Sequence, residues 1–148
     1  NTPLAIKISP DIKINEIESI SQILIEKKID ILIVSNSTDK NREVLKNINK
    51  LERGGLSGKP IEKISNNLIS KFYKTVGKKV KIIGVGGVND ASGVYDKLLS
   101  GASLVQLYTG MVYQGPYIAN KINKKLADIL INKGIKNIRE LIGTKNSA

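Results

Sequence analysis

The sequence contains no cysteine and no histidine. These absences exclude disulfides, thiolate nucleophiles, imidazole bases and the usual zinc sites, so we expect no metal centre. Aromatic residues make up only 4% of the chain. No stretch reaches the roughly 18 uninterrupted apolar residues that a membrane-spanning helix needs, and no basic-then-apolar signal segment opens the chain. Any chemistry must therefore use hydroxyls, lysines, carboxylates or a bound cofactor.

Acidic residues are few relative to basic ones. The 148 residues include 24 Lys and Arg against 13 Asp and Glu, a net charge of +11, and 41% are hydrophobic, which is enough for one globular domain. Such a charge is compatible with nucleic acid or an anionic membrane as a partner. However, the basic residues are mostly lysines scattered among Ile and Asn, as in Asn41–Lys50. We therefore expect a solvated lysine-rich surface and no nucleic-acid partner, with a general attraction for anionic ligands still compatible.

Short apolar runs alternate four times with longer segments of helical spacing. The runs are Leu4–Ile8, Asp30–Ser35, Val80–Val85 and Ser103–Tyr108. Each following segment carries apolar residues on one helical face, beginning at Ile14, Ile61, Ala91 and Ile118. This pattern predicts an α/β fold with a parallel sheet covered by helices, and a short helix over Asn137 to Ile142 closes the chain.

Two α/β architectures fit four such units. One is a small open doubly wound sheet, complete in about 150 residues, and the other is half of an eight-stranded barrel, which needs about 250 residues. Periodicity alone does not decide between them. The residues Asn1–Leu4 enter the first strand at once, as if the chain had been cut from something longer.

Unusual residues follow each of the four predicted strands. They are Lys7 with Ser9–Asp11, then Ser35–Thr38, then Gly86–Gly87, and finally Tyr108–Gly110. In both architectures the ligand lies beyond the carboxyl ends of parallel strands, so this arrangement is the one expected of a site. Turn residues alone would explain the glycines and serines, but not Lys7.

Lys7 places an ammonium in what should be a strand covered on both faces. Burying an unpaired charge is costly, so the side chain should meet an anion or reach solvent at the end of the strand. A lysine that merely extends to solvent is the plain interpretation. The functional interpretation is a fixed positive charge that faces an electron-rich ligand atom.

The pair Gly86–Gly87 lies between a strand and a helix that Asn89 or Asp90 would begin. Such a pair lets the backbone approach a ligand closely and exposes N–H groups, for which a phosphate is the natural guest. A tight turn without a ligand explains the pair equally well. A dinucleotide-binding motif fits less well because the third glycine is missing. In a barrel, the loops after the last two strands are the standard phosphate site, and they would be Gly86–Gly87 and Tyr108–Gly110.

The connection over residues 36–59 contains no convincing strand, and a loop of this length is usually functional or mobile. It includes three glycines and a serine within Gly54–Gly58. These residues predict a backbone folded tightly over a bound ring or anion, and a flexible hinge is the alternative.

Five blocks, in this order and spacing, resemble the C-terminal half of class 2 dihydroorotate dehydrogenase. The blocks are Ala5–Asp11 (AIKISPD), Ile33–Thr38 (IVSNST), Gly54–Pro60 (GGLSGKP), Ile82–Val88 (IIGVGGV) and Gly101–Thr109 (GASLVQLYT). The Lys59-Pro60 pair and Met111–Pro116 favour the membrane-associated, quinone-using class over the soluble classes. The resemblance implies that residues 1–148 are the C-terminal half, four βα units, of an FMN-binding (β/α)8 TIM barrel.

The resemblance also implies contacts for the flavin ring and the substrate. Lys7 would lie against the pyrimidine edge of the flavin, where its charge stabilises the negative charge of the reduced ring. Ser35 would hydrogen-bond the flavin, and Gly58 would contact it through its backbone. Asn36 and Ser37 would bind orotate, since the Asn side chain both donates and accepts. Family members often have Thr at the positions of Ser35 and Ser37, and the hydroxyl survives in both.

The implied phosphate site joins two loops. Gly86 and Gly87, with Tyr108 and Thr109, would hold the phosphate of FMN. On this interpretation the glycine pair makes room for a flavin phosphate.

The implied reaction is the oxidation of dihydroorotate to orotate in pyrimidine synthesis, with a quinone as the later electron acceptor. The resemblance places the catalytic base, a serine, on the first half of the barrel, so we assign no catalytic residue to this chain. It places the quinone tunnel and a peripheral membrane contact on N-terminal helices, at the bacterial cytoplasmic membrane or the inner mitochondrial membrane. The alternatives are another FMN barrel, such as a tRNA-dihydrouridine synthase, a non-catalytic anion-binding module and a basic RNA binder.

Overall fold

The computed structural model describes residues 2–40 and 42–146, which fold around one parallel sheet of four strands. The strands are β1 (Ala5–Ile8), β2 (Ile31–Val34), β3 (Lys81–Val85) and β4 (Leu104–Gln106). All four predicted strands are confirmed, each a little shorter than the apolar run that predicted it. Their order in the sheet is their order in the sequence. A doubly wound sheet reverses its strand order at a switch point, whereas a barrel adds each new strand beside the last, so the topology favours the half-barrel.

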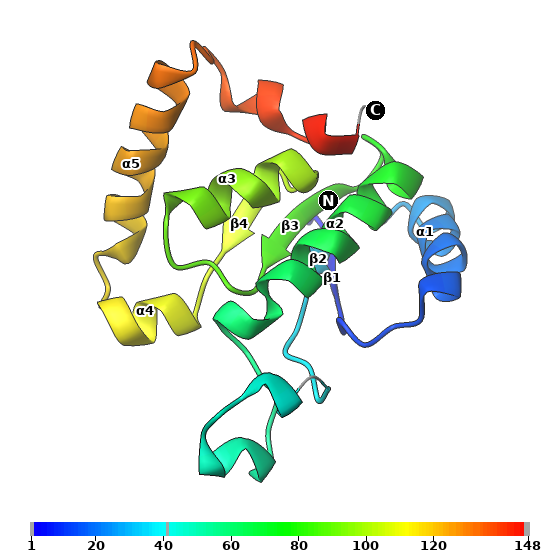
Figure 1. Ribbon diagram of the computed structural model, residues 1–148. Helices are drawn as coiled ribbons and strands as arrows, with labels where there is room; N and C mark the ends of the chain where they lie inside the picture. Colours follow the sequence, from blue (N-terminus) through cyan, green and yellow to red (C-terminus); the bar gives the residue numbers. More distant parts are fainter. Residues whose placement is uncertain (1, 41, 147–148) are drawn as a thin grey trace.

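Three helices of the crossovers pack side by side on one face of the sheet (Figure 1). These are α1 (Ile17–Glu26), α2 (Glu62–Val76) and α3 (Ala91–Ser100). After β4 the chain forms the short helix α4 (Thr109–Gln114) and then α5 (Ile118–Asn132), which packs against α3. The alternation of strands and helices thus follows the predicted βα pattern.

Two apolar clusters hold these elements together. In the first, Leu32 and Val34 of β2 are fully buried against α2, whose Phe72 is also fully buried. In the second, apolar residues of α3 pack against those of α5, including Leu98 and Ile122. Burial of side chains of this size contributes about 1.5–3 kcal/mol each, so these clusters fix the strands from one side.

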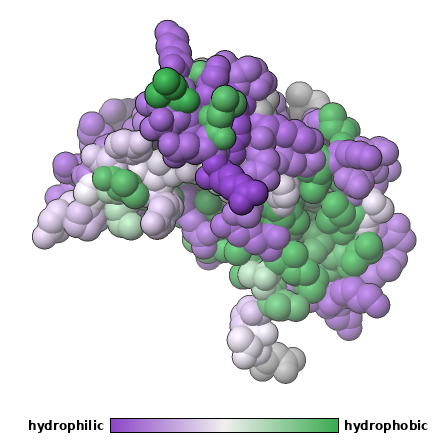
Figure 2. Space-filling model, turned by 90° about the horizontal axis from the view of Figure 1, so that it is seen from below, coloured by the Kyte–Doolittle hydropathy of each residue, from purple (hydrophilic) through white to green (hydrophobic). Residues whose placement is uncertain are grey.

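The prediction that helices cover the whole sheet is wrong for the residues described. Burial alternates along β2, where Leu32 and Val34 are buried while Ile31 and Ile33 stay partly exposed. Strand β1 forms one edge of the sheet, and Lys7 on it is exposed rather than enclosed on both faces. Figure 2 shows a broad hydrophobic patch on one side of the molecule, beside a mostly hydrophilic surface. In a barrel, the face of the sheet that the helices leave uncovered would point inward.

Local predictions differ from the structure at two places. Ile14 does not join the face of α1 but lies in a 3₁₀ turn before it and is 70% exposed. The expected helix near the C-terminus is a 3₁₀ turn over Ile138–Leu141 that Asn137 caps. The connection over residues 36–59 agrees with its prediction, since its described part has no strand and contains 3₁₀ turns and one isolated bridge between Thr38 and Leu56.

Candidate functional site

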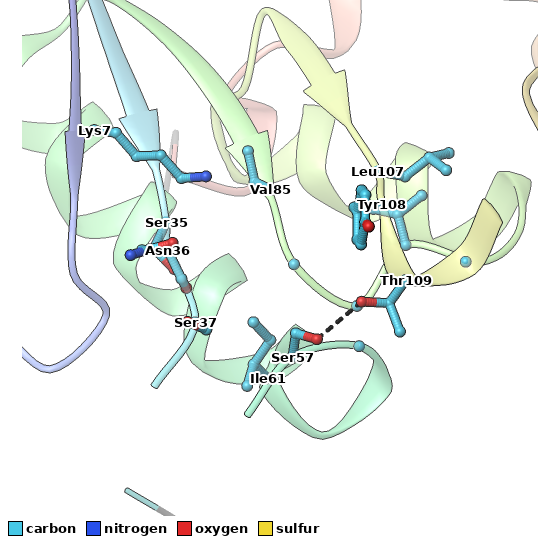
Figure 3. A pocket seen from close by; sticks show the side chains of 15 residues that line it. Lys7, Ser35, Asn36, Ser37, Ser57, Ile61, Val85, Leu107, Tyr108 and Thr109 are labelled. Atoms are coloured by element: carbon cyan, nitrogen blue, oxygen red, sulfur yellow. Dashed lines mark hydrogen bonds between the residues drawn. The ribbon is translucent and has the colours of Figure 1, made fainter. Parts of the chain in front are cut away.

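A pocket of about 210 Å³ opens where the carboxyl ends of the strands meet (Figure 3). All nine residues predicted to bind the cofactor or the substrate line it. They are Lys7, Ser35, Asn36, Ser37, Gly58, Gly86, Gly87, Tyr108 and Thr109. They come from β1, from the segments that follow β2, β3 and β4, and from the end of the long connection. The structure therefore brings the predicted residues together, while their individual binding roles stay predictions.

The segment after β2 is held between its two neighbouring strands. The backbone N–H of Ser35 donates to the carbonyl of Val85 at 3.2 Å, and that of Asn36 donates to the carbonyl of Ile8 at 2.8 Å. Ser35 is buried, whereas the side chain of Asn36 is exposed at the pocket. The backbone of Asn36 is thus fixed while its amide group is available to a ligand.

A carboxylate from the loop after β1 supports the same segment. Asp11 accepts a 2.5 Å hydrogen bond from the hydroxyl of Thr38 and a 3.1 Å bond from the backbone N–H of Asp39. Thr38 is fully buried. The carboxylate thus accepts hydrogen bonds from the two residues that follow Ser37, and these bonds fix the backbone where it passes the pocket.

The turn Gly86–Gly87 has positive φ at both residues, +116° and +79°. A Cβ on Gly87 would lie 2.6 Å from Cα of Glu62, and one on Gly86 would lie 2.9 Å from Cδ1 of Ile61. The first turn of α2 therefore occupies the space that these missing side chains leave. The sequence predicted room for a phosphate, and the structure adds a second reason for the glycines, which is close packing of the turn on α2.

The other side of the turn remains available to a ligand. Outside the helices and the strand ladders, no hydrogen bond among residues 2–40 and 42–146 engages the N–H of Gly86 or Gly87. Both residues line the pocket. Two backbone donors at the mouth of a parallel sheet suit an anionic group.

The long connection closes onto the segment after β4. The hydroxyls of Ser57 and Thr109 lie 2.9 Å apart in a hydrogen bond, drawn in Figure 3. Gly58 has φ of +77°, and a Cβ there would lie 3.0 Å from Cγ2 of Thr109. Tyr108 is 73% exposed at the edge of the pocket. The backbone at Gly58 therefore contacts Thr109 directly, while its predicted approach to a bound ring or anion stays a prediction.

Charge at the pocket comes from one side chain that points toward it. In Figure 3 the side chain of Lys7 extends from β1 toward the ends of the other strands. Lys59, which follows Gly58, pairs with Glu62 at 2.6 Å, and this hydrogen bond raises the pKa of Lys59 while Glu62 balances its charge. The charge of Lys7 therefore favours an anionic ligand at the pocket.

Sequence reasoning missed Ser57 and Lys97. Ser57 lies inside a block that was recognised, directly before Gly58, so its place in the block was a usable signal. Lys97 is fully buried, although we expected the lysines to be solvated. The signal was its position three residues after Val94 and next to Leu98, which puts it on the apolar side of α3.

Comparisons with known proteins agree with this geometry. The family model for dihydroorotate dehydrogenase matches residues 1–130. The dihydroorotate dehydrogenase (quinone) of Haloarcula marismortui is 40% identical over 141 residues, which cover 95% of this chain and 40% of that protein. The mitochondrial dihydroorotate dehydrogenase (quinone) of Arabidopsis thaliana is 40% identical over 143 residues, or 95% of this chain and 31% of that protein.

Solved structures give the same result. A dihydroorotate dehydrogenase (DHODH) from Eimeria tenella in complex with ferulenol matches with a TM-score of 0.95 and 36% identity, covering 100% of this chain and 39% of that one. This match confirms the predicted fold class, an α/β chain of four βα units that covers part of a (β/α)8 barrel. The chain spans about two fifths of the length of most relatives it matches. The extent of the family match and the shared fold together show that the chain belongs to the dihydroorotate dehydrogenase family, among its quinone-dependent, class 2 members.

Proposed function

We propose that the full-length protein oxidises dihydroorotate to orotate with FMN as its cofactor and a quinone as electron acceptor, in pyrimidine synthesis. Membership of the family implies a flavin cofactor, and the finer choice of FMN is part of the proposal. The observation that carries it is the convergence of all nine residues on one pocket, from four strand ends and the connection over residues 36–59.

The residues present fit FMN. The N–H groups of Gly86 and Gly87 are donors suited to its phosphate, and Thr109 adds a hydroxyl at the same edge of the pocket. Lys7 supplies a positive charge for the pyrimidine side of the ring, and the side chain of Ser35 and the backbone of Gly58 lie on the walls between. When bound, FMN supplies the acceptor for the hydride that leaves the substrate.

Asn36 and Ser37 would hold the substrate. The exposed amide of Asn36 can donate to one group of the orotate ring and accept from its neighbour, and the hydroxyl of Ser37 can do the same. The backbone bonds of Ser35 and Asn36, together with the contacts of Asp11, keep these side chains in place. Contacts that hold the substrate in its reactive orientation lower the barrier of the chemical step.

We assign the catalytic base to the first half of the barrel, which would pair with this chain along the free edges of β1 and β4 and cover the open face of the sheet. Residues 1–148 would then be the C-terminal half of an FMN-binding TIM-barrel domain. Among the described residues, no helix combines the length and hydrophobicity needed to cross a bilayer. We propose that N-terminal helices outside this chain make the quinone site and a peripheral contact with the bacterial cytoplasmic membrane or the inner mitochondrial membrane. The relative from Arabidopsis thaliana is named as mitochondrial.

The test is anaerobic mixing of the purified full-length protein with dihydroorotate, followed by flavin absorbance. We expect a yellow protein whose flavin is bleached by the substrate. Asn36→Ala should retain flavin but lose bleaching, because it removes substrate contacts and leaves the phosphate site intact. The control is Asn67→Ala, which changes an exposed asparagine on α2 outside the pocket.

Each contrary outcome has a distinct meaning. A wild-type protein that stays colourless after incubation with FMN would favour a binding module without redox chemistry. A yellow protein that dihydroorotate does not bleach would favour another FMN barrel. Bleaching at an unchanged rate in Asn36→Ala would refute the role of Asn36.

A further inference from the structure

Lys97 is a lysine enclosed in the protein interior behind the pocket. It lies on α3 and is 0% exposed. Its stem fills the space beside Gly84 of β3, where an added Cβ would lie 3.0 Å from Cδ of the lysine. Its ammonium donates to Oγ of Ser65 at 3.0 Å and to Oδ1 of Asn66 at 2.8 Å, both on α2. Lys97 therefore joins α3, β3 and α2 at one point.

Ser65 links Lys97 to the end of β3 by hydrogen bonds. Its hydroxyl donates to the carbonyl of Val85 at 2.6 Å, and the same carbonyl accepts the backbone N–H of Ser35 at 3.2 Å. A Cβ on Gly86 would lie 3.4 Å from Cβ of Ser65, so the serine stands directly behind the turn. The Val85 carbonyl is thus the point where the segment after β2, the end of β3 and α2 are tied together.

The charge of Lys97 fixes the direction of this chain of hydrogen bonds. An ammonium has three donors and no lone pair, so the Ser65 oxygen must accept from it and must point its own proton at the Val85 carbonyl. A neutral amine can also accept a hydrogen bond, in which case the serine proton can turn away from Val85. Only the protonated lysine enforces a single arrangement.

We propose that Lys97 is a positioning residue which, through Ser65 and the Val85 carbonyl, holds the Gly86–Gly87 turn in the shape that binds the cofactor phosphate. This inference rests on the proposed FMN site for its ligand. It does not rest on that site for its geometry, which involves only residues of this chain.

The surroundings of Lys97 make its charge sensitive to pH. The pKa of Lys97 falls from 10.5 to about 8, chiefly because burial disfavours the charged form, with a smaller lowering effect from Lys59 on the turn before α2. Glu62 of α2 and Asp96 of α3 oppose this shift by attraction. Burying a charge costs stability, so stability alone does not explain this ammonium, whereas the geometry that it organises does.

The first experiment measures FMN affinity of the full-length protein between about pH 7 and about pH 9.5. We expect wild-type affinity to fall as the pH rises through about 8, the pKa of Lys97. In Lys97→Met, which keeps the length of the stem and removes the charge, affinity should be about tenfold weaker at neutral pH and should lose that pH dependence. The control is Lys63→Met, which removes an exposed lysine of α2 and should keep the wild-type profile. A purely structural role would change stability but leave the profile near pH 8 in place, and that result would overturn the proposal.

A second experiment does not need the flavin. We expect amide hydrogen exchange at Ser35, whose N–H donates to the Val85 carbonyl, to be faster in Lys97→Met than in the wild type at neutral pH, and equally fast in Ser65→Ala. If Lys97→Met fails to fold, Ser65→Ala and the wild-type pH profile decide the question, because both leave the lysine stem in place. Unchanged exchange in the variants that fold would overturn the proposal. A wild type that binds no FMN would instead refute the proposed function, and the exchange data would still report on Lys97.

Discussion

Gly87→Ala adds one methyl group where the backbone of the protein already lies. At a φ of +79°, an L-residue costs about 1–2 kcal/mol relative to glycine. The new Cβ would lie 2.6 Å from Cα and 3.0 Å from the backbone nitrogen of Glu62, and a helix backbone cannot turn aside as the tip of a side chain can. Displacing α2 costs roughly 1–3 kcal/mol more, so we expect the free energy of unfolding to fall by about 2–5 kcal/mol.

Gly134→Ala is the matched control, since Gly134 has φ of +67° and no atom within 4 Å of the position of an added Cβ. It should lose only the conformational part, about 1–2 kcal/mol. The assay is urea denaturation of the full-length protein followed by circular dichroism, together with the flavin content of the folded fraction. Gly87→Ala should lose more stability than the control and should also lose flavin. Equal losses of stability in the two variants would refute the reasoning that packing on α2 requires this glycine.

Three further changes test other contacts. Thr38→Val removes the hydroxyl that donates a hydrogen bond to Asp11. We expect the free energy of unfolding to fall by about 1–3 kcal/mol and dihydroorotate to bind more weakly. An unchanged dissociation constant for dihydroorotate would contradict the supporting role of this pair. Ser57→Ala breaks the bond to Thr109 at an exposed position, so stability should change by less than about 0.5 kcal/mol while limited proteolysis of residues 36–59 becomes faster; the same cleavage rate would argue against this closure. The pKa of Lys97 is lower in the folded protein than in the unfolded chain, so the unfolded chain binds more protons between about pH 8 and 10.5. In that window the free energy of unfolding of the wild type should rise relative to Lys97→Met, by up to about 3 kcal/mol. Parallel stability curves for the two proteins would show that the lysine titrates normally.

The sheet could be predicted from the sequence because a buried parallel strand needs an apolar run and its crossover needs an apolar helical face. Val80–Val85 meets the first condition and β3 forms there. The order of the strands could not be predicted in this way. Periodicity counts βα units but does not say which strands are neighbours, and the blocks that resemble the family supplied that information.

The site could be predicted because the carboxyl ends of parallel strands meet at one edge. Lys7 and Asn36, which are far apart in the sequence from Thr109, line the same pocket for this reason. The exposure of Lys7 could not be predicted, because burial depends on which faces of the sheet are covered. Neither could the contact between Gly87 and Glu62, since the approach of a helix to a turn is a property of the tertiary packing.

Lys97 illustrates the limit of reasoning from composition. A lysine-rich chain is expected to expose its lysines, and a single exception changes no bulk number. Only the packing of α3 against α2 and β3 reveals that this ammonium meets two side-chain oxygens instead of water.

The central claim is that the strand ends form one FMN site, and the most direct test is a crystal structure of the full-length protein with FMN. We predict phosphate oxygens within hydrogen-bond distance of the N–H groups of Gly86 and Gly87, with the ammonium of Lys7 against the pyrimidine edge of the flavin ring. A flavin whose phosphate binds away from this turn, or a Lys7 side chain directed away from the ring, would contradict the account.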